Sequence, residues 1–187
     1  MAKINAPVTP PENVELETPF FAVTVPKLVT LTTFTWGFYF LVWAYFNWDK
    51  ARLTPSHKFG IVTRSLILPL VFNFPLFRKI RRATLEHGSQ PLPSPTFLAL
   101  AFLVLSLFSL WRASWWSLLA FASVFPLAIV QARVNSLHTR LGFDARANGS
   151  FTLLNIIACV LGGGYLAFHV APLLVWLYQV AVWKLRS

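Results

Sequence analysis

Cysteine and acidic side chains are the scarce residue types in this chain of 187 residues. The single cysteine, Cys159, excludes an intrachain disulfide and any Cys-x-x-Cys metal or redox motif. Only six residues are acidic, and none of them lies inside a long apolar block. Ion-coupled transporters commonly need carboxylates within the membrane, and acid–base catalysis commonly needs a pair of them. The scarcity of acids therefore argues against both functions.

Motifs for other kinds of chemistry are missing as well. The four histidines form no HxxxH or HxxE spacing, which metal sites on one helix use. The serines are not part of a GxSxG or SxxK motif, the usual setting of a serine nucleophile. We therefore predict no catalytic residue, no metal ligand and no cofactor, and an enzyme is the less favoured class of protein.

Apolar residues are what the chain has in abundance. The sequence is 56% hydrophobic and 12% charged, and its mean hydropathy is +0.61. The apolar residues fall in long blocks and not at a spacing of three to four, which is typical of helices that face lipid all round. The composition predicts an all-α membrane protein with about four transmembrane helices, a broken interfacial or re-entrant helix and a C-terminal interfacial helix.

The blocks divide the chain into a polar N-terminal tail, residues 1–24, and a single helical membrane domain, residues 25–187. Spans are predicted at 28–48, 96–111, 115–130 and 151–170, because each is apolar and nearly free of charge. Trp43 and Trp48 near the end of the first span suggest an aromatic belt at the headgroups. Ser94 and Pro95 mark the start of the second span, and a connection of three residues predicts an antiparallel hairpin with the third.

Two further segments are predicted to lie at the interface, residues 60–77 and 172–185. The first contains Arg64, Pro69 and Pro75. A charged arginine is costly in a lipid-facing helix because lipid cannot solvate it. Each proline is costly because lipid cannot replace the backbone hydrogen bond that it removes. A crossing by this segment is left open. The second follows Pro172, which is expected to end the fourth span.

The net charge of +10 comes from lysines and arginines between the apolar blocks. If residues 60–77 do not cross, the loops at 49–60, 78–90 and 131–150 share one side and hold ten of these residues, against five on the other side. The positive-inside rule then predicts cytoplasmic basic loops and periplasmic termini. The expected partners of this charge are anionic lipid headgroups, not nucleic acid.

The first apolar block resembles the opening of small bacterial inner-membrane proteins related to DUF4234, which carry a K-L, T-x-G-x-Y and W-x-Y-x-x-W pattern before a basic loop. The residues that carry the likeness are Lys27, Leu28, Thr33, Trp36, Gly37, Phe38, Tyr39, Trp43, Tyr45, Phe46, Asn47 and Trp48. A later run is similar to gammaproteobacterial relatives and comprises Gln131, Asn135, Asn148, Asn155, Gly162 and Gly163. The family has no established activity, so the resemblance implies a bacterial inner membrane.

Several basic residues are candidates for binding a lipid or another ligand. Arg64, with Arg78 and Lys79, could hold a lipid phosphate, because guanidinium groups donate to phosphate in a planar fork. The simpler interpretation is that Arg64 extends to the headgroups and sets the depth of its helix.

Amides and glycines give the remaining candidates. Asn73, Gln131, Asn135 and Asn155 could line a polar pocket, or could join helices by hydrogen bonds, which is the more common role of amides in membranes. The run Gly162, Gly163 and Gly164 predicts close helix packing, with a hinge as the alternative.

The favoured function is a non-enzymatic accessory or interaction module, with another membrane protein as a further partner. The alternative is a lipid-handling protein that binds, transports or modifies a phospholipid-like amphiphile. A lipid-handling protein should have a cavity open sideways to the bilayer and lined by Arg64, Asn73 and Asn155. An interaction module should have a filled core and an exposed helix face. A channel would need oligomerisation, because four such helices leave no room for a pore.

Overall fold

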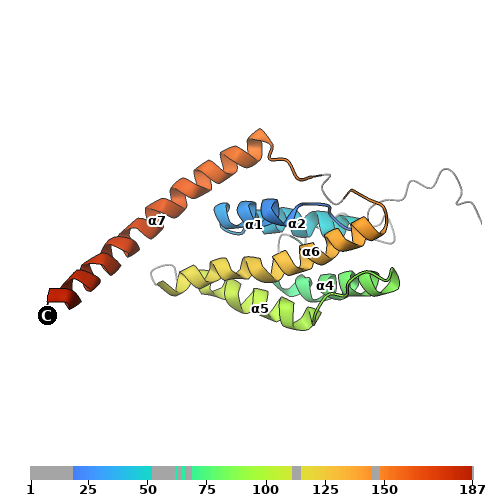
Figure 1. Ribbon diagram of the computed structural model, residues 1–187, viewed down its shortest axis with the longest axis horizontal. Coiled ribbons are helices and arrows are strands. Elements are labelled where there is room, and N and C mark those ends of the chain that lie inside the picture. Colours follow the sequence, from blue (N-terminus) through green and yellow to red (C-terminus); the bar gives the residue numbers. More distant parts are fainter. Residues whose placement is uncertain are drawn as a thin grey trace, which may run out of the picture.

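In the computed structural model all regular secondary structure is helical within the described residues, which are 19–51, 62, 65, 69–110, 115–144 and 148–186 (Figure 1). Within these ranges no residue is in a strand, so the predicted all-α class is confirmed. The helices are α1 (Val25–Phe34), α2 (Phe38–Lys50), α4 (Pro69–Glu86), α5 (Pro95–Leu107), the 3-10 helices η2 (Phe108–Leu110) and η3 (Trp115–Ser123), α6 (Val124–Arg140) and α7 (Leu153–Arg186).

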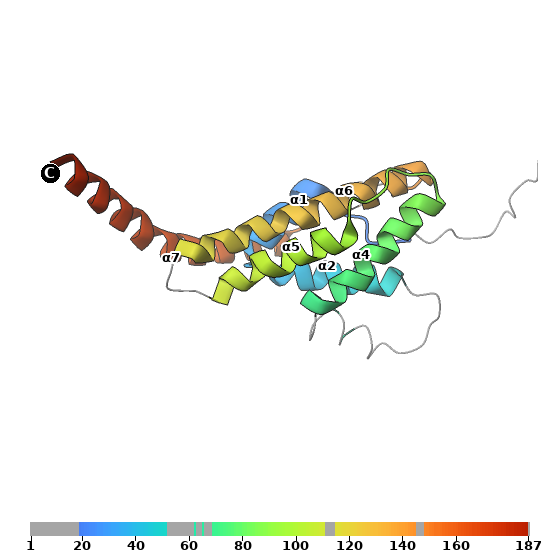
Figure 2. The ribbon, with the colours of Figure 1, turned by 90° about the horizontal axis from the view of Figure 1, so that it is seen from below.

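Helix α6 lies at the centre of the bundle. It packs against α1 on one side and against α4 and α5 on the other, as Figures 1 and 2 show. Its buried residues recur every three or four positions, which places them on one stripe of the helix. The fully buried apolar members of this stripe are Leu127, Val130, Val134 and Leu137.

The predicted first span, residues 28–48, is two helices and not one. Trp36 and Gly37 adopt left-handed backbone angles, with φ values of 55° and 86°, and the Gly37 N–H donates back to the Thr32 carbonyl over 2.8 Å. Helices α1 and α2 have 10 and 13 residues, or about 15 and 20 Å at 1.5 Å per residue. Each is shorter than a hydrocarbon core of about 30 Å. The aromatic-belt prediction is also wrong, because Trp43 and Trp48 are buried in the core.

Helix α4 continues where the sequence predicted a break. Its 18 residues run through Pro75 to Glu86, so residues 78–86 are helical and not part of a loop. Buried residues at 73, 76, 77, 80 and 84 form its inner stripe, and four basic residues lie on its exposed side. This amphipathic pattern outweighs the proline, which is exposed and costs the helix one hydrogen bond. Arg64 and most of the segment before Pro69 lie outside the described residues.

Helices α5 and α6 form the predicted hairpin: α5 and η2 run antiparallel to η3 and α6 and pack along them (Figure 1). Helix α5 begins at Pro95, and the Ser94 hydroxyl accepts a hydrogen bond from the Phe97 N–H over 3.3 Å. Helix α6, however, extends to Arg140, so residues 131–140 are not loop as predicted. Of the polar residues there, Gln131 and His138 are fully buried, whereas Thr139 and Arg140 are exposed.

Two helical stretches of the described chain are long and apolar enough to cross a membrane, Leu118–Arg140 and Leu153–Lys184. The apolar stretch Pro95–Leu110 is shorter. The expected four transmembrane helices are therefore not supported by helix length.

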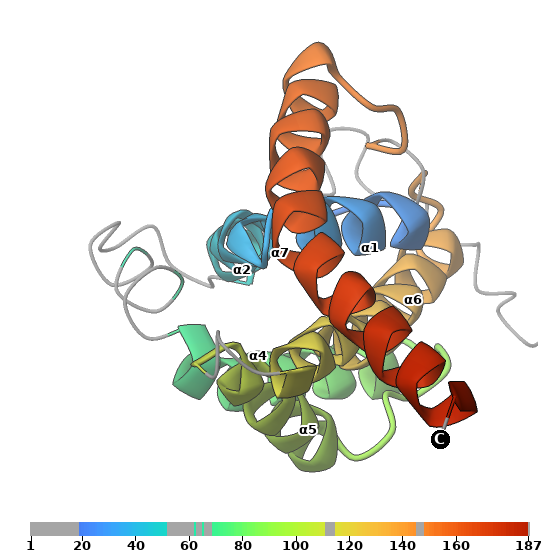
Figure 3. The ribbon, with the colours of Figure 1, turned by 90° about the vertical axis from the view of Figure 1, so that its left-hand side faces the viewer.

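Helix α7 is continuous over 34 residues, with Pro172 inside it. The predicted division into a span at 151–170 and an interfacial helix at 172–185 is therefore wrong. Figure 3 shows α7 passing α1, and Figures 1 and 2 show that its C-terminal part extends away from the other helices. The most apolar window of α7 contains no buried residue. The chain therefore combines a packed bundle with one long, apolar and exposed helix.

Two glycines allow α7 to approach α1 closely. A Cβ atom at Gly162 would collide with the Phe34 carbonyl group and lie 2.7 Å from its carbon atom. A Cβ at Gly163 would lie 3.2 Å from the Phe34 ring, whereas one at Gly164 would have no neighbour within 4 Å. The contact is backbone against backbone, as small residues permit. Helix α7 continues unbroken through all three glycines, so the close-packing interpretation fits this structure without a hinge.

We expect Gly162→Ala to lower the free energy of unfolding by about 1–3 kcal/mol, because the methyl group cannot fit against the Phe34 backbone. Gly164→Ala is the matched control and should be neutral or stabilising by up to about 1 kcal/mol, because alanine favours the helix and has room. Thermal unfolding of the detergent-solubilised chain measures both. Equal shifts for the two variants would contradict the α1–α7 contact.

Candidate functional site

The amide of Gln131 is the centre of a buried polar network. Its Oε1 accepts a hydrogen bond from the Trp43 indole N–H over 2.6 Å. Its Nε2 donates to the Phe21 carbonyl over 3.2 Å and to Asn135 Oδ1 over 2.8 Å. Asn135 Nδ2 in turn donates to the Val23 carbonyl over 3.1 Å. Gln131 and Trp43 are both fully buried.

Asn47 extends this network along α2. Its Nδ2 donates to the Trp43 carbonyl over 2.8 Å, and its Oδ1 accepts from the Phe21 N–H over 3.3 Å. Side chains of α2 and α6 thus form hydrogen bonds with backbone groups of residues 21–23. These residues precede α1, so their backbone groups have no partners within a helix. Each such bond contributes about 1 kcal/mol net, and each would cost more if broken in the core. In this arrangement the amides of Asn47, Gln131 and Asn135 have a structural role: they join α2, α6 and the segment before α1.

Lys27 forms a second polar centre, at the start of α1. Its side chain is 2% exposed, and its Nζ donates to Asn148 Oδ1 and to the Ser150 carbonyl, each over 2.7 Å. In the amide orientation that satisfies both ends of Asn155, its Oδ1 lies 3.2 Å from the same Nζ. These acceptors are neutral, and burial lowers the pKa of Lys27. The lysine fixes the segment before α7 to α1.

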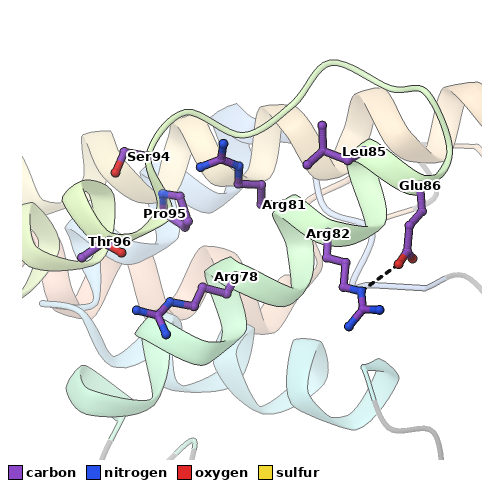
Figure 4. Close-up of a pocket in the computed structure, with 8 residues that line it drawn as sticks. All are labelled: Arg78, Arg81, Arg82, Leu85, Glu86, Ser94, Pro95 and Thr96. Atoms are coloured by element: carbon purple, nitrogen blue, oxygen red, sulfur yellow. Dashed lines mark hydrogen bonds and ion pairs between the residues drawn. The ribbon is translucent and has the colours of Figure 1, made fainter.

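The third polar feature is the exposed side of α4. Arg78, Arg81 and Arg82 line a cavity of about 440 Å³ together with the start of α5 (Figure 4). Arg82 Nε donates to Glu86 Oε1 over 2.8 Å. Lys79 points elsewhere: its Nζ donates to the Ala51 carbonyl over 3.3 Å and lies 5.4 Å from the centre of a Trp48 ring.

The predicted polar pocket of four amides is not assembled among the described residues. Gln131 and Asn135 are bonded to each other, but Asn155 lies beside Lys27. Asn73 is 1% exposed in α4, and neither of its amide atoms has a hydrogen-bond partner within the described part of the chain. The four residues therefore belong to three separate places in the fold.

Sequence reasoning missed Lys27, Trp43 and Asn47 as members of these clusters. Trp43 and Asn47 lie one helical turn apart, and Gln131 and Asn135 have the same spacing. Two pairs of hydrogen-bonding side chains, each with a spacing of four on an apolar helix, were the signal in the sequence that could have indicated this network. Lys27 stands alone in the first turn of an apolar helix, a position that also fits an ordinary headgroup contact.

His138, which was expected in a polar loop, is fully buried in α6, and its ring packs edge-on against Phe143. In the described ranges no group of three or more His, Cys, Asp or Glu side chains comes together.

The fold and these clusters define an all-helical protein with two helices that are long and apolar enough to cross a membrane. Comparisons of the chain with protein-family models, curated proteins and solved structures gave no match. The resemblance to DUF4234-related proteins therefore stays a prediction.

Gln131→Met tests the network, because methionine keeps the length of the side chain but offers no hydrogen bonds. We expect the free energy of unfolding to fall by about 1–3 kcal/mol, since Trp43 and Asn135 would lose buried partners. Thr139→Ala, an exposed change on the same helix, is the control and should have little effect. A Gln131→Met protein as stable as the control in a denaturant titration would refute the importance of the network.

Lys27→Met tests the second centre through its pH dependence. Because the folded chain lowers the pKa of Lys27 below 10.5, the unfolded chain binds more protons between the two values. The free energy of unfolding should therefore rise with pH in this window, by at most about 1.4 kcal/mol per pH unit. We expect Lys27→Met to remove this rise and the exposed Lys50→Met to retain it, as measured by unfolding at a series of alkaline pH values. Parallel profiles for both variants would contradict the assignment.

Proposed function

We propose that this chain is an integral membrane protein and acts as a non-enzymatic interaction module in a bacterial inner membrane. The proposal combines a packed helical bundle, which carries the basic side of α4, with α7 as a membrane-crossing helix. Anionic headgroups are its lipid partners, and another membrane protein is its partner along α7.

The observation that carries this proposal is the exposure of α7. Apolar side chains cover the helix, and Leu153, Leu154, Val160 and Leu161 are each at least 68% exposed. An apolar surface of this extent is unfavourable in water at about 25 cal/mol per Å² and calls for lipid or protein around it. At 1.5 Å per residue, α7 is about 51 Å long, which exceeds the hydrocarbon core by several turns.

The distribution of positive charge supports an orientation. Helices α2, α4 and α6 all end at the same end of the bundle, as Figures 1 and 2 show. Lys50, Arg82 and Arg140 lie at or near these ends. The positive-inside rule puts this end on the cytoplasmic side, so that α7 leads to a periplasmic C-terminus.

The core favours an interaction module over a lipid-handling protein. Asn73 is enclosed in the bundle and Asn155 lies against Lys27, and neither lines the cavity beside Arg78 or the one beside Gly88. A lipid-handling role remains the second candidate, because the cavity beside Arg78 and Arg81 has the charge that a phospholipid headgroup needs.

The proposal predicts a protein neighbour along α7. A photo-crosslinking amino acid in place of Leu161, activated in membranes washed with sodium carbonate, should give an adduct with a membrane protein as well as with lipid. The same amino acid in place of Gln90, an exposed polar position between α4 and α5, is the control and should not give that protein adduct.

Two outcomes would contradict the proposal separately. Release of the chain into the carbonate extract would refute membrane integration. Lipid adducts alone at position 161, with the chain retained in the membrane, would refute the interaction role and leave α7 as an anchor.

A further inference from the structure

The cavity between α4 and α5 has one strongly basic wall and one uncharged wall. One wall is formed by Arg78, Arg81 and Arg82, and the other by Ser94, Pro95 and Thr96 at the start of α5. Figure 4 shows that the side chains of Arg78 and Arg81 extend toward the α5 wall, whereas Arg82 turns toward Glu86. The hollow of about 440 Å³ is large enough for a small ligand group.

The charges in this cavity are not balanced within the described chain. Glu86 is the only acid in the wall, and its carboxylate is bound to Arg82 over 2.8 Å. The guanidinium groups of Arg78 and Arg81 have no hydrogen bond or ion pair among the described residues. Like charges three or four residues apart on a helix destabilise it, so two unpaired arginines need an outside anion or solvent.

The opposite face of α4 holds these arginines in place. Phe77, Ile80 and Thr84 are fully buried on the inner stripe, which fixes the rotation of the helix. Residues 78, 81, 82 and 85 follow at helical spacing on the outer side and share one face. The arginine cluster is therefore anchored by the core, although its charged groups are open to solvent.

The α5 wall adds donors without adding charge. The Ser94 hydroxyl is used as the cap for the Phe97 N–H, and Pro95 has no N–H. The Thr96 N–H is one of the first-turn donors that an α-helix cannot satisfy internally. The partial positive charge at this helix start favours an anion in front of it.

We infer that Arg78 and Arg81, facing the start of α5, form a binding site for a phosphate group. Two planar guanidinium forks match the oxygens of a phosphate, and the helix start completes the positive surroundings. The phosphate belongs either to a lipid headgroup or to a soluble phosphate ester. Leu85, 55% exposed at the edge of the cavity, offers an apolar contact to the acyl chains of a lipid. As a lipid site, it rests on the proposed membrane location.

Lipid retention tests the headgroup source. The detergent-solubilised chain is incubated with phosphatidylglycerol, and the bound lipid is counted by native mass spectrometry. We expect the double variant Arg78→Gln/Arg81→Gln to bind this lipid about tenfold more weakly, because charge-assisted hydrogen bonds are lost. Arg140→Gln/Lys50→Gln removes the same charge from exposed positions outside this cavity and is the control. Arg81→Lys keeps the charge but not the fork and should bind with intermediate affinity.

A second arm tests the soluble source. Inorganic phosphate and glycerol phosphate are added to the same proteins, and the shift of the melting temperature is measured. A shift that the Arg78→Gln/Arg81→Gln variant loses, without selective lipid retention, assigns the site to a soluble phosphate. Selective lipid retention without such a shift assigns it to a headgroup.

Equal lipid retention and equal melting shifts in the site variant and the control would overturn the inference. The melting temperatures without ligand verify that each variant is folded. Because the chain is studied in detergent, failure of this site is distinct from failure of membrane integration, which the carbonate extraction reports.

Discussion

The rest of the bundle depends on the requirement that Gln131 satisfy both ends of its amide inside an apolar core. The Trp43 indole, the Phe21 carbonyl and Asn135 meet this requirement together. A polar group without partners in such surroundings costs more than an ordinary hydrogen bond contributes. The network therefore fixes the rotation of α6 against α2 and holds residues 21–23, the irregular segment before α1, in place. Once α6 is fixed, α4 and α5 pack on its other side.

The exposed helix α7 is attached to this bundle by contacts of different kinds. Gly162 allows its backbone to touch the backbone of α1 at Phe34, and Lys27 binds the segment that leads into it. The glycine contact lies in the first half of α7, and the lysine contact lies just before the helix begins. The second half extends away from the bundle, and its apolar side chains remain available to lipid or to another protein. A packed body and an unpacked apolar helix are thus combined in one short chain.

Helix α4 relates the core to the charged surface. Its inner stripe is buried against the bundle, and its outer side carries Arg78, Arg81 and Arg82 beside the start of α5. The same rotation of the helix that buries Phe77 and Ile80 determines where the guanidinium groups lie. The basic surface is for this reason a defined feature of the fold. The sequence had predicted a loop for residues 78–90, whereas residues 78–86 are part of α4.

The sequence by itself determined the helical class, the apolar blocks, the hairpin of α5 and α6 with its start at Pro95, and the shortage of residues for catalysis. These follow from composition, length and capping chemistry, which are local. Only the tertiary structure decided the break at Trp36 and Gly37, the extension of α4 and α6 through polar residues, and the burial of Lys27 and Trp43. The reason is physical. The apolarity of a segment can be read from its residues, but whether a polar side chain is exposed or satisfied in the core depends on partners that lie far away in the chain, such as Gln131 for Trp43.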